Sequence, residues 1–199
     1  RDPFAGYKLE SVPVNHRYLT GEQFAKLTGV ELPTYRLCHA RDLFVFSTFT
    51  GLGRADLANL TSENIVTEPD GSRWIHIERQ KTKAECHIKL LDIPSRIIDK
   101  YKGEGKDGKL FFVPATSSLC RSLKMIEEQC KLGCHLTFYM ARHSFATLIC
   151  LGNGVPIETI SRMMGHSSIR TTQIYAEITN QKVNRDPVSY THLRAHETL

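Results

Sequence analysis

Apolar residues recur at helical spacing through most of this chain. Thr20 and Gln23 stand three residues apart ahead of an apolar run, in the arrangement of a capping box, so a helix is expected to begin near Gly21. The same spacing predicts further helices over residues 33–49, 56–60, 95–101, 116–132, 138–151, 157–164 and from 169 onward.

The middle of the chain changes to an alternating pattern. Arg73–Glu78 and Cys86–Leu90 place polar and apolar residues in turn on either side of the polar segment 80–85, which predicts an antiparallel hairpin. Leu110–Val113 is predicted to be a short buried strand. The expected fold class is therefore mainly α with a small antiparallel β-sheet, an α+β domain without internal repeats.

The composition is that of an ordinary globular protein, with 41% hydrophobic and 24% charged residues among 199. This length suits one domain with its own hydrophobic core. No apolar run approaches membrane-spanning length and no signal-peptide pattern is visible, so a cytoplasmic protein is expected. The formal net charge of +5 permits nucleic acid as a partner without requiring it.

Six cysteines are scattered along a chain that is too large to need disulfides, and we interpret them as reduced intracellular thiols. Cys130, Cys134 and His135 form a small cluster that could indicate a metal site. No second ligand pair stands at zinc-finger spacing from it, so structural packing is the favoured interpretation. Neither a metal nor a cofactor is expected.

Both ends of the sequence suggest that it is part of something else. The opening, Arg1-Asp-Pro-Phe, resembles the middle of a longer chain. Residues 187–199 resemble an in-frame translation of a common transposase sequencing adapter, and we therefore exclude them from the argument on fold and function. The expected domain comprises residues 1–186.

Arg142 and His143 lie inside a predicted helix that is otherwise apolar. A buried arginine must be paired or must face an anion, because an unpaired buried charge is very costly. An internal salt bridge is the alternative explanation for Arg142. His143 is better explained as a hydrogen-bonded core residue than as a catalyst.

A second polar group follows in the segment 164–175. Gly165 can close one helix in the left-handed conformation, and Ser167 or Ser168 can cap the next. Tyr175 then lies about two turns into that next helix, so His166 and Tyr175 can face one pocket across the turn. A helical tyrosine on its own would usually be a core or surface residue.

The segments 141–147, 163–169 and 171–175 together resemble the motifs of the tyrosine recombinase (phage integrase) family. The resemblance runs from about residue 3 to residue 184, and it is greatest to integrases of bacterial conjugative transposons and genomic islands. It implies the catalytic-domain fold of the DNA breaking-rejoining enzymes. It also implies a site-specific recombinase that forms a 3′-phosphotyrosine intermediate during integration or excision of a mobile element.

The family pattern implies a role for each matching residue. Tyr175 would be the nucleophile on the scissile phosphate, Arg142 would clamp that phosphate, and His166 would hydrogen-bond the phosphate or the nucleophile. Lys81, in the predicted hairpin tip, matches the family's β-hairpin lysine, which protonates the departing 5′ oxygen. Without the resemblance, Lys81 would be interpreted as a solvated surface charge.

These residue types suit phosphoryl transfer. An arginine fork neutralises charge as the pentacoordinate transition state forms, and a preorganised donor of this kind is commonly worth about 3 kcal/mol. A tyrosine, with a reference pKa near 10, needs a base or a positive field to become a nucleophile. A lysine can protonate the leaving alkoxide if its pKa is brought toward neutrality.

Two positions depart from the family pattern. The family's first arginine directly follows Thr-Gly-Leu, whereas here Gly53 follows Leu52 and Arg54 comes one residue later. One residue rotates a helical side chain by about 100°, so Arg54 is expected to substitute only in part, unless another basic group supplies the charge. Tyr139 stands where the second motif has histidine, and its hydroxyl can donate a hydrogen bond but cannot carry positive charge.

Two other functions compete with this interpretation. A catalytically degenerate DNA-binding module is favoured by Gly53 and Tyr139, and a topoisomerase of type IB uses similar chemistry. The resemblance further implies double-stranded DNA attachment sites, a homotetramer on DNA, accessory bending or excision factors, no membrane, and association with the bacterial nucleoid. It also implies N-terminal arm and core-binding domains that are missing from this sequence.

Overall fold

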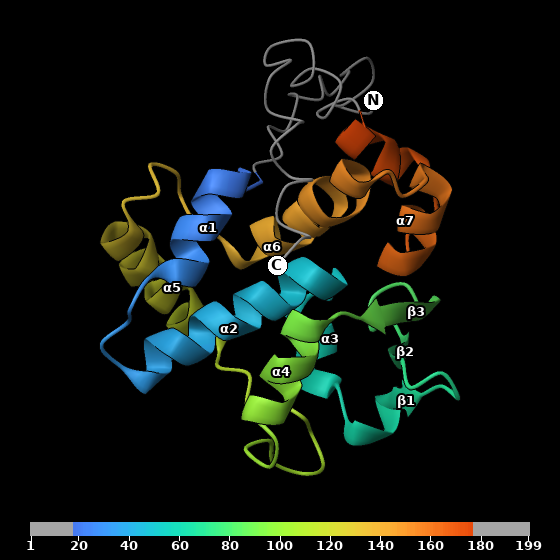
Figure 1. Cartoon of the computed structure of the whole chain (residues 1–199), viewed down its shortest axis with the longest axis horizontal. Helices are drawn as coiled ribbons and strands as arrows, with labels where there is room; N and C mark the ends of the chain where they lie inside the picture. Colours follow the sequence, from blue (N-terminus) through green and yellow to red (C-terminus); the bar gives the residue numbers. More distant parts are fainter. Residues whose placement is uncertain (1–17, 177–199) are drawn as a thin grey trace, which may run out of the picture.

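Helix α2 (Tyr35–Thr50) runs through the centre of the computed structural model, which describes residues 18–176. Figure 1 shows it between α1 (Gly21–Gly29), α5 (Thr116–Cys130) and α6 (Phe138–Ser144) on one side and α4 (Asp92–Lys100) on the other. The described part is completed by α3 (Arg54–Asn59), β1 (Ile65–Thr67), β2 (Arg73–Glu78), β3 (Glu85–Leu90), α7 (Ile157–Met164) and helical residues 170–176.

The central position of α2 follows from its apolar residues, which face two core clusters. Leu43 and Phe46 pack into one cluster with the sheet and α4. Leu37, Ala40 and Phe44 pack into the other with α1, α5 and α6. A helix that is apolar on most of its circumference is buried on most of it, and α2 therefore fixes the positions of the elements around it.

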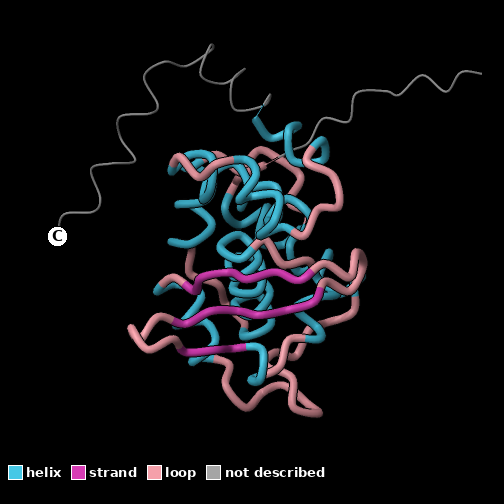
Figure 2. The backbone as a smooth tube through the Cα atoms, turned by 90° about the vertical axis from the view of Figure 1, so that its right-hand side faces the viewer, coloured by secondary structure: helices cyan, strands magenta, loops and turns pink. Residues whose placement is uncertain are grey.

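The strands β1, β2 and β3 form an antiparallel sheet in that order. Figure 2 shows them side by side along the helical body. Ile75 pairs with Ile88 and Ile77 with Cys86, and all four side chains are buried against the helices. The alternation in the sequence thus predicted both the hairpin and its buried face, and the mainly α fold with a small antiparallel sheet is confirmed.

The prediction of a strand at Leu110–Val113 is wrong. Lys109 forms only an isolated bridge to Thr61, and the backbone N–H of Leu110 donates to the carbonyl of Leu60 at 2.8 Å. Leu110 and Phe111 are buried as predicted, but no neighbouring strand is available to extend the ladder. The third strand of the sheet is Ile65–Thr67, which is too short to show an alternating pattern.

Several helix boundaries also differ from the prediction. Helix α3 begins at Arg54 because the Asp56 carboxylate accepts from the backbone N–H of Gly53 at 3.2 Å and caps the first turn. Helix α4 begins at Asp92, since Pro94 lies in its first turn, where a missing N–H is tolerated. The helix predicted over 138–151 widens into a π-helical segment, Phe145–Cys150.

The predicted domain boundary at residue 186, the adapter-like segment 187–199 and the opening residues lie outside the described residues. None of the helices within residues 18–176 is long and apolar enough to cross a membrane.

Candidate active site

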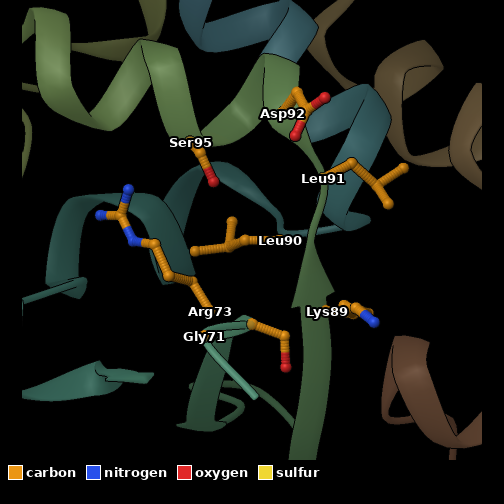
Figure 3. Close-up of a pocket in the computed structure, with 8 residues that line it drawn as sticks. Gly71, Arg73, Lys89, Leu90, Leu91, Asp92 and Ser95 are labelled. Atoms are coloured by element: carbon orange, nitrogen blue, oxygen red, sulfur yellow. The ribbon is translucent and has the colours of Figure 1, made fainter. Parts of the chain in front are cut away.

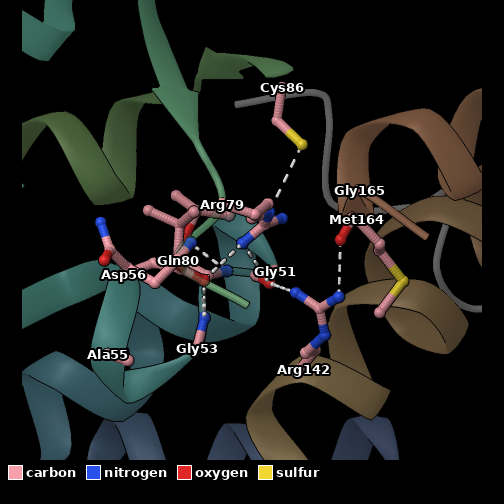
Figure 4. A network of polar contacts seen from close by, with 12 residues as sticks. Gly51, Gly53, Ala55, Asp56, Arg79, Gln80, Cys86, Arg142, Met164 and Gly165 are labelled. Carbon is pink, nitrogen blue, oxygen red and sulfur yellow. Dashed lines mark hydrogen bonds and ion pairs between the residues drawn. The ribbon is translucent and has the colours of Figure 1, made fainter. Parts of the chain in front are cut away.

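Four segments that are distant in the sequence meet at one place in the fold. They are the end of α2, the β2–β3 hairpin, the middle of α6, and the turn that follows α7 (Figures 1 and 4). Two arginines lie at their junction, Arg142 from α6 and Arg79 from the residue after β2. Both donate to the backbone carbonyl of Gly51, Arg142 at 2.6 Å and Arg79 at 3.3 Å.

Arg142 is half-buried and bonds to the ends of two helices. Its Nη1 donates to Gly51 and its Nη2 donates to the carbonyl of Met164 at 2.6 Å. Burial lowers the pKa of Arg142, and the neighbouring Arg79 lowers it further. A guanidinium has five N–H donors; two are used in these bonds, which leaves three for an anion.

Arg79 is a functional candidate that our reading of the sequence missed. It is 3% exposed, and its Nη1 forms an ion pair with Asp56 at 3.0 Å. Its Nη2 donates to the carbonyl of Met163 at 2.7 Å, and its Nε lies 3.4 Å from the Sγ of Cys86. One signal could have revealed it, because Arg79 continues the inward-facing positions 75 and 77 of β2.

Asp56 organises this part of the site from the first turn of α3. Its carboxylate accepts from the backbone N–H of Gly53 and of Gln80, and from Arg79. Gly53 stands at the position of the family's first arginine. The Asp56 contacts therefore bring the guanidinium of Arg79 next to the turn from which that arginine would otherwise come (Figure 4).

Arg54 points to a different place. Its Nη1 donates to the carbonyl of Pro114 at 3.2 Å. Within residues 18–176, no hydrogen bond joins it to Gly51, Asp56 or Arg142. The structure thus does not bring Arg54 into the arginine cluster, and its predicted role as a partial substitute stays a prediction.

Four aromatic side chains form a row beside Arg142. The ring of buried His143 lies between Tyr139, with centroids 4.3 Å apart, and Tyr175, with centroids 5.3 Å apart. The ring of His166 stacks on the other side of Tyr175 at 6.5 Å and 17°. Tyr139 is 62% exposed. The structure therefore brings Tyr139, His166 and Tyr175 together with Arg142.

Tyr175 is only 3% exposed and packs in a cluster with Phe145, Ile160 and Met164. Burial raises the pKa of Tyr175 to about 12, Tyr139 adds to this effect, and Arg142 opposes it. The influence of Arg142 on this pKa places the phenol within electrostatic range of the guanidinium. A buried phenol with a raised pKa is protonated at pH 7 and is therefore a weak nucleophile in this arrangement.

His166 follows the turn at Gly165. Its Nδ1 lies 2.8 Å from the hydroxyl of the buried Thr172, and this contact fixes the ring. Burial lowers the pKa of His166 to about 4, with Arg142 and Arg79 contributing further. The imidazole is therefore neutral at pH 7 and can offer a hydrogen bond but no charge.

Lys81 is exposed in the hairpin tip, residues 80–83. The tip is closed by two backbone bonds between Arg79 and the other end of the loop, one with Ala84 and one with Lys83. Lys83 has φ +57°, which gives the turn its left-handed residue. Among the described residues Lys81 forms no ion pair, so its ammonium group points into solvent where DNA could reach it.

The cysteine cluster does not form a metal site. Cys130 and Cys134 pack against the core cluster around α5, as expected, and burial raises the pKa of Cys130. His135 lies 3.3 Å from Glu127. In the part of the chain that the structure describes, no group of three or more His, Cys, Asp or Glu residues could hold a metal ion, and none of the six cysteines forms a disulfide.

A surface pocket lies at the other end of the hairpin. It is lined by Arg73, Lys89, Asp92 and neighbouring residues (Figure 3). The six residue steps from Arg73 to Arg79 span about 20 Å of extended chain. The pocket is therefore separate from the arginine cluster and contains none of the candidate site residues.

Comparison with known proteins places this chain in a family. The model of the phage integrase family matches residues 17–182. The tyrosine recombinase XerA of Saccharolobus solfataricus is 32% identical over 130 residues, which cover 65% of this chain and 42% of that protein. This chain therefore spans less than half the length of that relative.

Solved structures share the fold at lower sequence identity. The XerH site-specific recombinase, bound to a palindromic difH substrate in a post-cleavage complex, has a TM-score of 0.70 and 20% identity. That likeness covers 88% of this chain and 53% of XerH. The Tn1549 transposon integrase in complex with transposon right-end DNA has a TM-score of 0.64 and 17% identity, over 89% of this chain and 68% of the integrase.

The fold is thus that of a tyrosine recombinase catalytic domain, and it carries that family's motifs at one junction. The chain belongs to the phage integrase family. The finer resemblance to integrases of conjugative transposons and genomic islands stays a prediction.

Proposed function

We propose that this chain is the catalytic domain of a site-specific DNA recombinase that cuts and rejoins DNA through a covalent bond to Tyr175. The convergence of Arg142, His166 and Tyr175 carries this proposal, because the three are brought together from separate parts of the chain. Arg142 and Tyr175 interact electrostatically, and the Tyr175 ring stacks on His166. The charge, the donor and the nucleophile of a phosphoryl transfer are thus within one site.

In the proposed reaction, the oxygen of Tyr175 forms a bond to phosphorus and its proton passes to the neutral His166. The bond from phosphorus to the 5′ oxygen breaks, and Lys81 protonates that oxygen. The free donors of Arg142 neutralise the phosphate oxygens, and the hydroxyl of Tyr139 supplies a further hydrogen bond. The phosphotyrosine conserves the energy of the phosphodiester, so the reverse reaction rejoins the DNA without ATP.

Arg79 takes the electrostatic role of the first arginine in this proposal. Its guanidinium shares the Gly51 carbonyl with Arg142, and it lowers the pKa of His166. Because Arg79 is buried, it acts by holding Arg142 in place and by adding to the positive electrostatic field at the site. Four of its five N–H donors are used within the protein, so one is left for a phosphate oxygen.

Cleavage requires a rearrangement near Tyr175. The ring lies in an apolar cluster in the free protein, so the helical residues 170–176 must shift before the hydroxyl meets a phosphate. Binding of DNA can drive this shift, because the contact between the Tyr175 hydroxyl and a phosphate held by Arg142 forms only in the shifted arrangement.

The proposal includes the partners that the family resemblance implies. These are double-stranded attachment sites, a homotetramer on DNA, and accessory bending or excision factors, in the integration or excision of a mobile element. Such an enzyme would act at the bacterial nucleoid. The formal net charge of +5 and the exposed Lys81 support binding to DNA.

The test is covalent capture from a pool of nicked duplexes with a randomised central segment. A nick beside the cleaved bond lets the short fragment that carries the new 5′ hydroxyl diffuse away. A phosphotyrosine complex therefore accumulates and survives denaturation in SDS. We expect the 199-residue chain to retain a subset of sequences and the Tyr175→Phe variant to retain none.

Other outcomes separate the competing functions. Binding to DNA without any SDS-resistant complex would indicate a degenerate binding module. Capture without sequence preference, together with relaxation of supercoiled plasmid, would indicate an activity like that of a type IB topoisomerase. Covalent capture by Tyr175→Phe would disprove the assignment of the nucleophile.

A further inference from the structure

The end of helix α7 accepts a side chain on each of four consecutive backbone carbonyls. Three of the donors come from the β2–β3 hairpin and its flanks, and the fourth is Arg142. The contacts are Cys86 Sγ to Arg162 at 3.3 Å, Arg79 Nη2 to Met163 at 2.7 Å, Arg142 Nη2 to Met164 at 2.6 Å, and Thr82 Oγ1 to Gly165 at 2.9 Å.

Side chains can reach these carbonyls because the last carbonyls of a helix lack the usual N–H partner four residues later; that of Arg162 also accepts from the backbone N–H of Gly165 at 3.0 Å. Gly165 ends α7 with φ +63°, and a Cβ there would lie 2.7 Å from the Cγ of Arg79 and 2.8 Å from the Sγ of Cys86. The hairpin can therefore approach the end of α7 only because this residue is glycine. His166 follows directly, so the hairpin is joined to the segment that carries His166 and Tyr175.

Thr82 makes the contact nearest to the proposed general acid. It is adjacent to Lys81 in the hairpin tip, residues 80–83. Among the described residues of this tip, Thr82 is the one whose side chain forms a hydrogen bond to an element outside the hairpin. The ammonium of Lys83, by contrast, pairs with Glu78 on β2, within the hairpin. Arg79 and Cys86 join the base of the hairpin to the end of α7, and the Thr82 hydroxyl joins the tip itself to the residue before His166.

We propose that Thr82 is a positioning residue for the cleavage step. Its hydroxyl donates to the carbonyl of Gly165 and holds the hairpin tip beside the turn that carries His166, so that Lys81 reaches the 5′ oxygen while Tyr175 attacks. This inference rests on the role proposed above for Lys81. It adds that protonation of the leaving group and delivery of the nucleophile depend on one junction, the end of α7.

The chemistry of the leaving group gives a readout that a purely structural role would not produce. A 5′ oxygen leaves as a strongly basic alkoxide and needs the proton from Lys81. A sulfur in the same bridging position leaves as a weakly basic thiolate and needs no general acid. A variant that only misplaces Lys81 is therefore slow on the oxygen substrate and normal on the sulfur substrate.

The experiment uses the captured duplex in its oxygen form and with a bridging 5′ sulfur. Single-turnover cleavage is measured for the wild type, Thr82→Val, Thr82→Ser and Lys81→Ala. Valine has the shape of threonine but no donor, whereas serine keeps the hydroxyl. Thermal unfolding of each variant checks that it is folded, and the exposed position of Thr82 makes large losses of stability unexpected.

On the oxygen substrate we expect Thr82→Val to be slower by about five- to tenfold, as for one lost hydrogen bond. On the sulfur substrate it should regain a rate within about twofold of the wild type, and Thr82→Ser should match the wild type on both. Lys81→Ala should lose about 10²- to 10⁴-fold on oxygen and recover on sulfur.

Equal slowing of Thr82→Val on both substrates, or no slowing on either, would overturn the positioning role. Failure of the sulfur substrate to rescue Lys81→Ala would instead overturn the assignment of Lys81 as the general acid. The two failures are distinguishable because each concerns a different variant.

Discussion

Arg79 should be essential for cleavage although it lies outside the motifs that define the family. A direct test must remove its charge without leaving a buried charge behind. Arg79 and Asp56 form a buried ion pair at 3.0 Å. Breaking such a pair by removing one partner costs about 3–5 kcal/mol, a large part of the 5–15 kcal/mol that typically stabilises a domain.

The double variant Arg79→Met/Asp56→Asn avoids this cost by removing both charges. Methionine fills much of the apolar stem of arginine, and the single amide oxygen of asparagine can still accept from one of the two N–H groups that the Asp56 carboxylate binds, which are those of Gly53 at Oδ2 and of Gln80 at Oδ1. We expect a folded protein. Its cleavage should be slower by about 10²- to 10³-fold, as for other losses of a preorganised donor, or about 3–4 kcal/mol.

The assay is single-turnover formation of the SDS-resistant complex at saturating DNA, with urea unfolding of each variant in parallel. Arg54→Ala is the matched control, because Arg54 bonds to Pro114 outside the arginine cluster. The reasoning is refuted if the folded double variant cleaves within about threefold of the wild type, or if Arg54→Ala is the slower of the two.

Three further predictions concern neighbouring residues. Gly165→Ala should lower the free energy of unfolding by at least about 1 kcal/mol, because φ of Gly165 is positive and the added Cβ would force Arg79 to move. Gly29→Ala is the control and should not lower it, because a Cβ at Gly29 meets no atom within 4 Å. Equal urea midpoints of the two variants would contradict this prediction. Tyr139→His should speed cleavage by up to about tenfold by restoring the family residue, and an unchanged or lower single-turnover rate would count against a phosphate contact. The pKa of His166 is lowered to about 4 from its ordinary 6.5, so its contribution to the free energy of unfolding is complete above pH 6.5 and is lost as the pH falls toward 4. Urea unfolding of the His166→Asn variant should therefore show a smaller loss of stability between pH 6.5 and pH 4 than the wild type shows. An identical loss in the two proteins would disprove this prediction.

The parts of the fold that the sequence predicted depend on local rules. The capping box of Thr20 and Gln23 marks the start of α1 because its two hydrogen bonds lie within four residues. The alternation in β2 and β3 predicted the buried face of the hairpin because the side-chain period of a strand is two. Where structure depends on neighbours far along the chain, as at Leu110–Val113, the local pattern could not show that a partner strand was absent.

The candidate site divides in the same way. Arg142, His166 and Tyr175 were found from the spacing of motifs, and the structure brings them together. Arg79 was missed because a basic residue at the edge of a polar hairpin tip looks like a solvated charge. Its burial depends on Asp56, which lies 23 residues earlier and directs the guanidinium inward. The alternation of β2 places Arg79 on the inward face, but the same alternation would continue to the exposed Lys81 two residues later, and the tertiary contact is what separates the two.

The free domain holds its catalytic groups in a resting arrangement. With a pKa of about 12, the phenol of Tyr175 is ionised in only about one molecule in 10⁵ at pH 7. Besides the Arg79 contacts with Asp56 and Cys86, the two arginines donate to the carbonyls of Gly51, Met163 and Met164, which lie at the negative ends of two helix dipoles.

A phosphate that enters beside Arg142 meets donors that are already oriented, so the arginines need little reorganisation. The tyrosine, by contrast, must leave an apolar cluster. The arginine donors, which are already in place, therefore lower the barrier to cleavage, whereas the movement of Tyr175 out of its apolar cluster adds to that barrier. In the proposed function, the release concerns residues 170–176 and the proposed general acid lies in a hairpin tip that is fixed to the end of α7, so cutting depends on correct docking of DNA while the phosphate site stays formed.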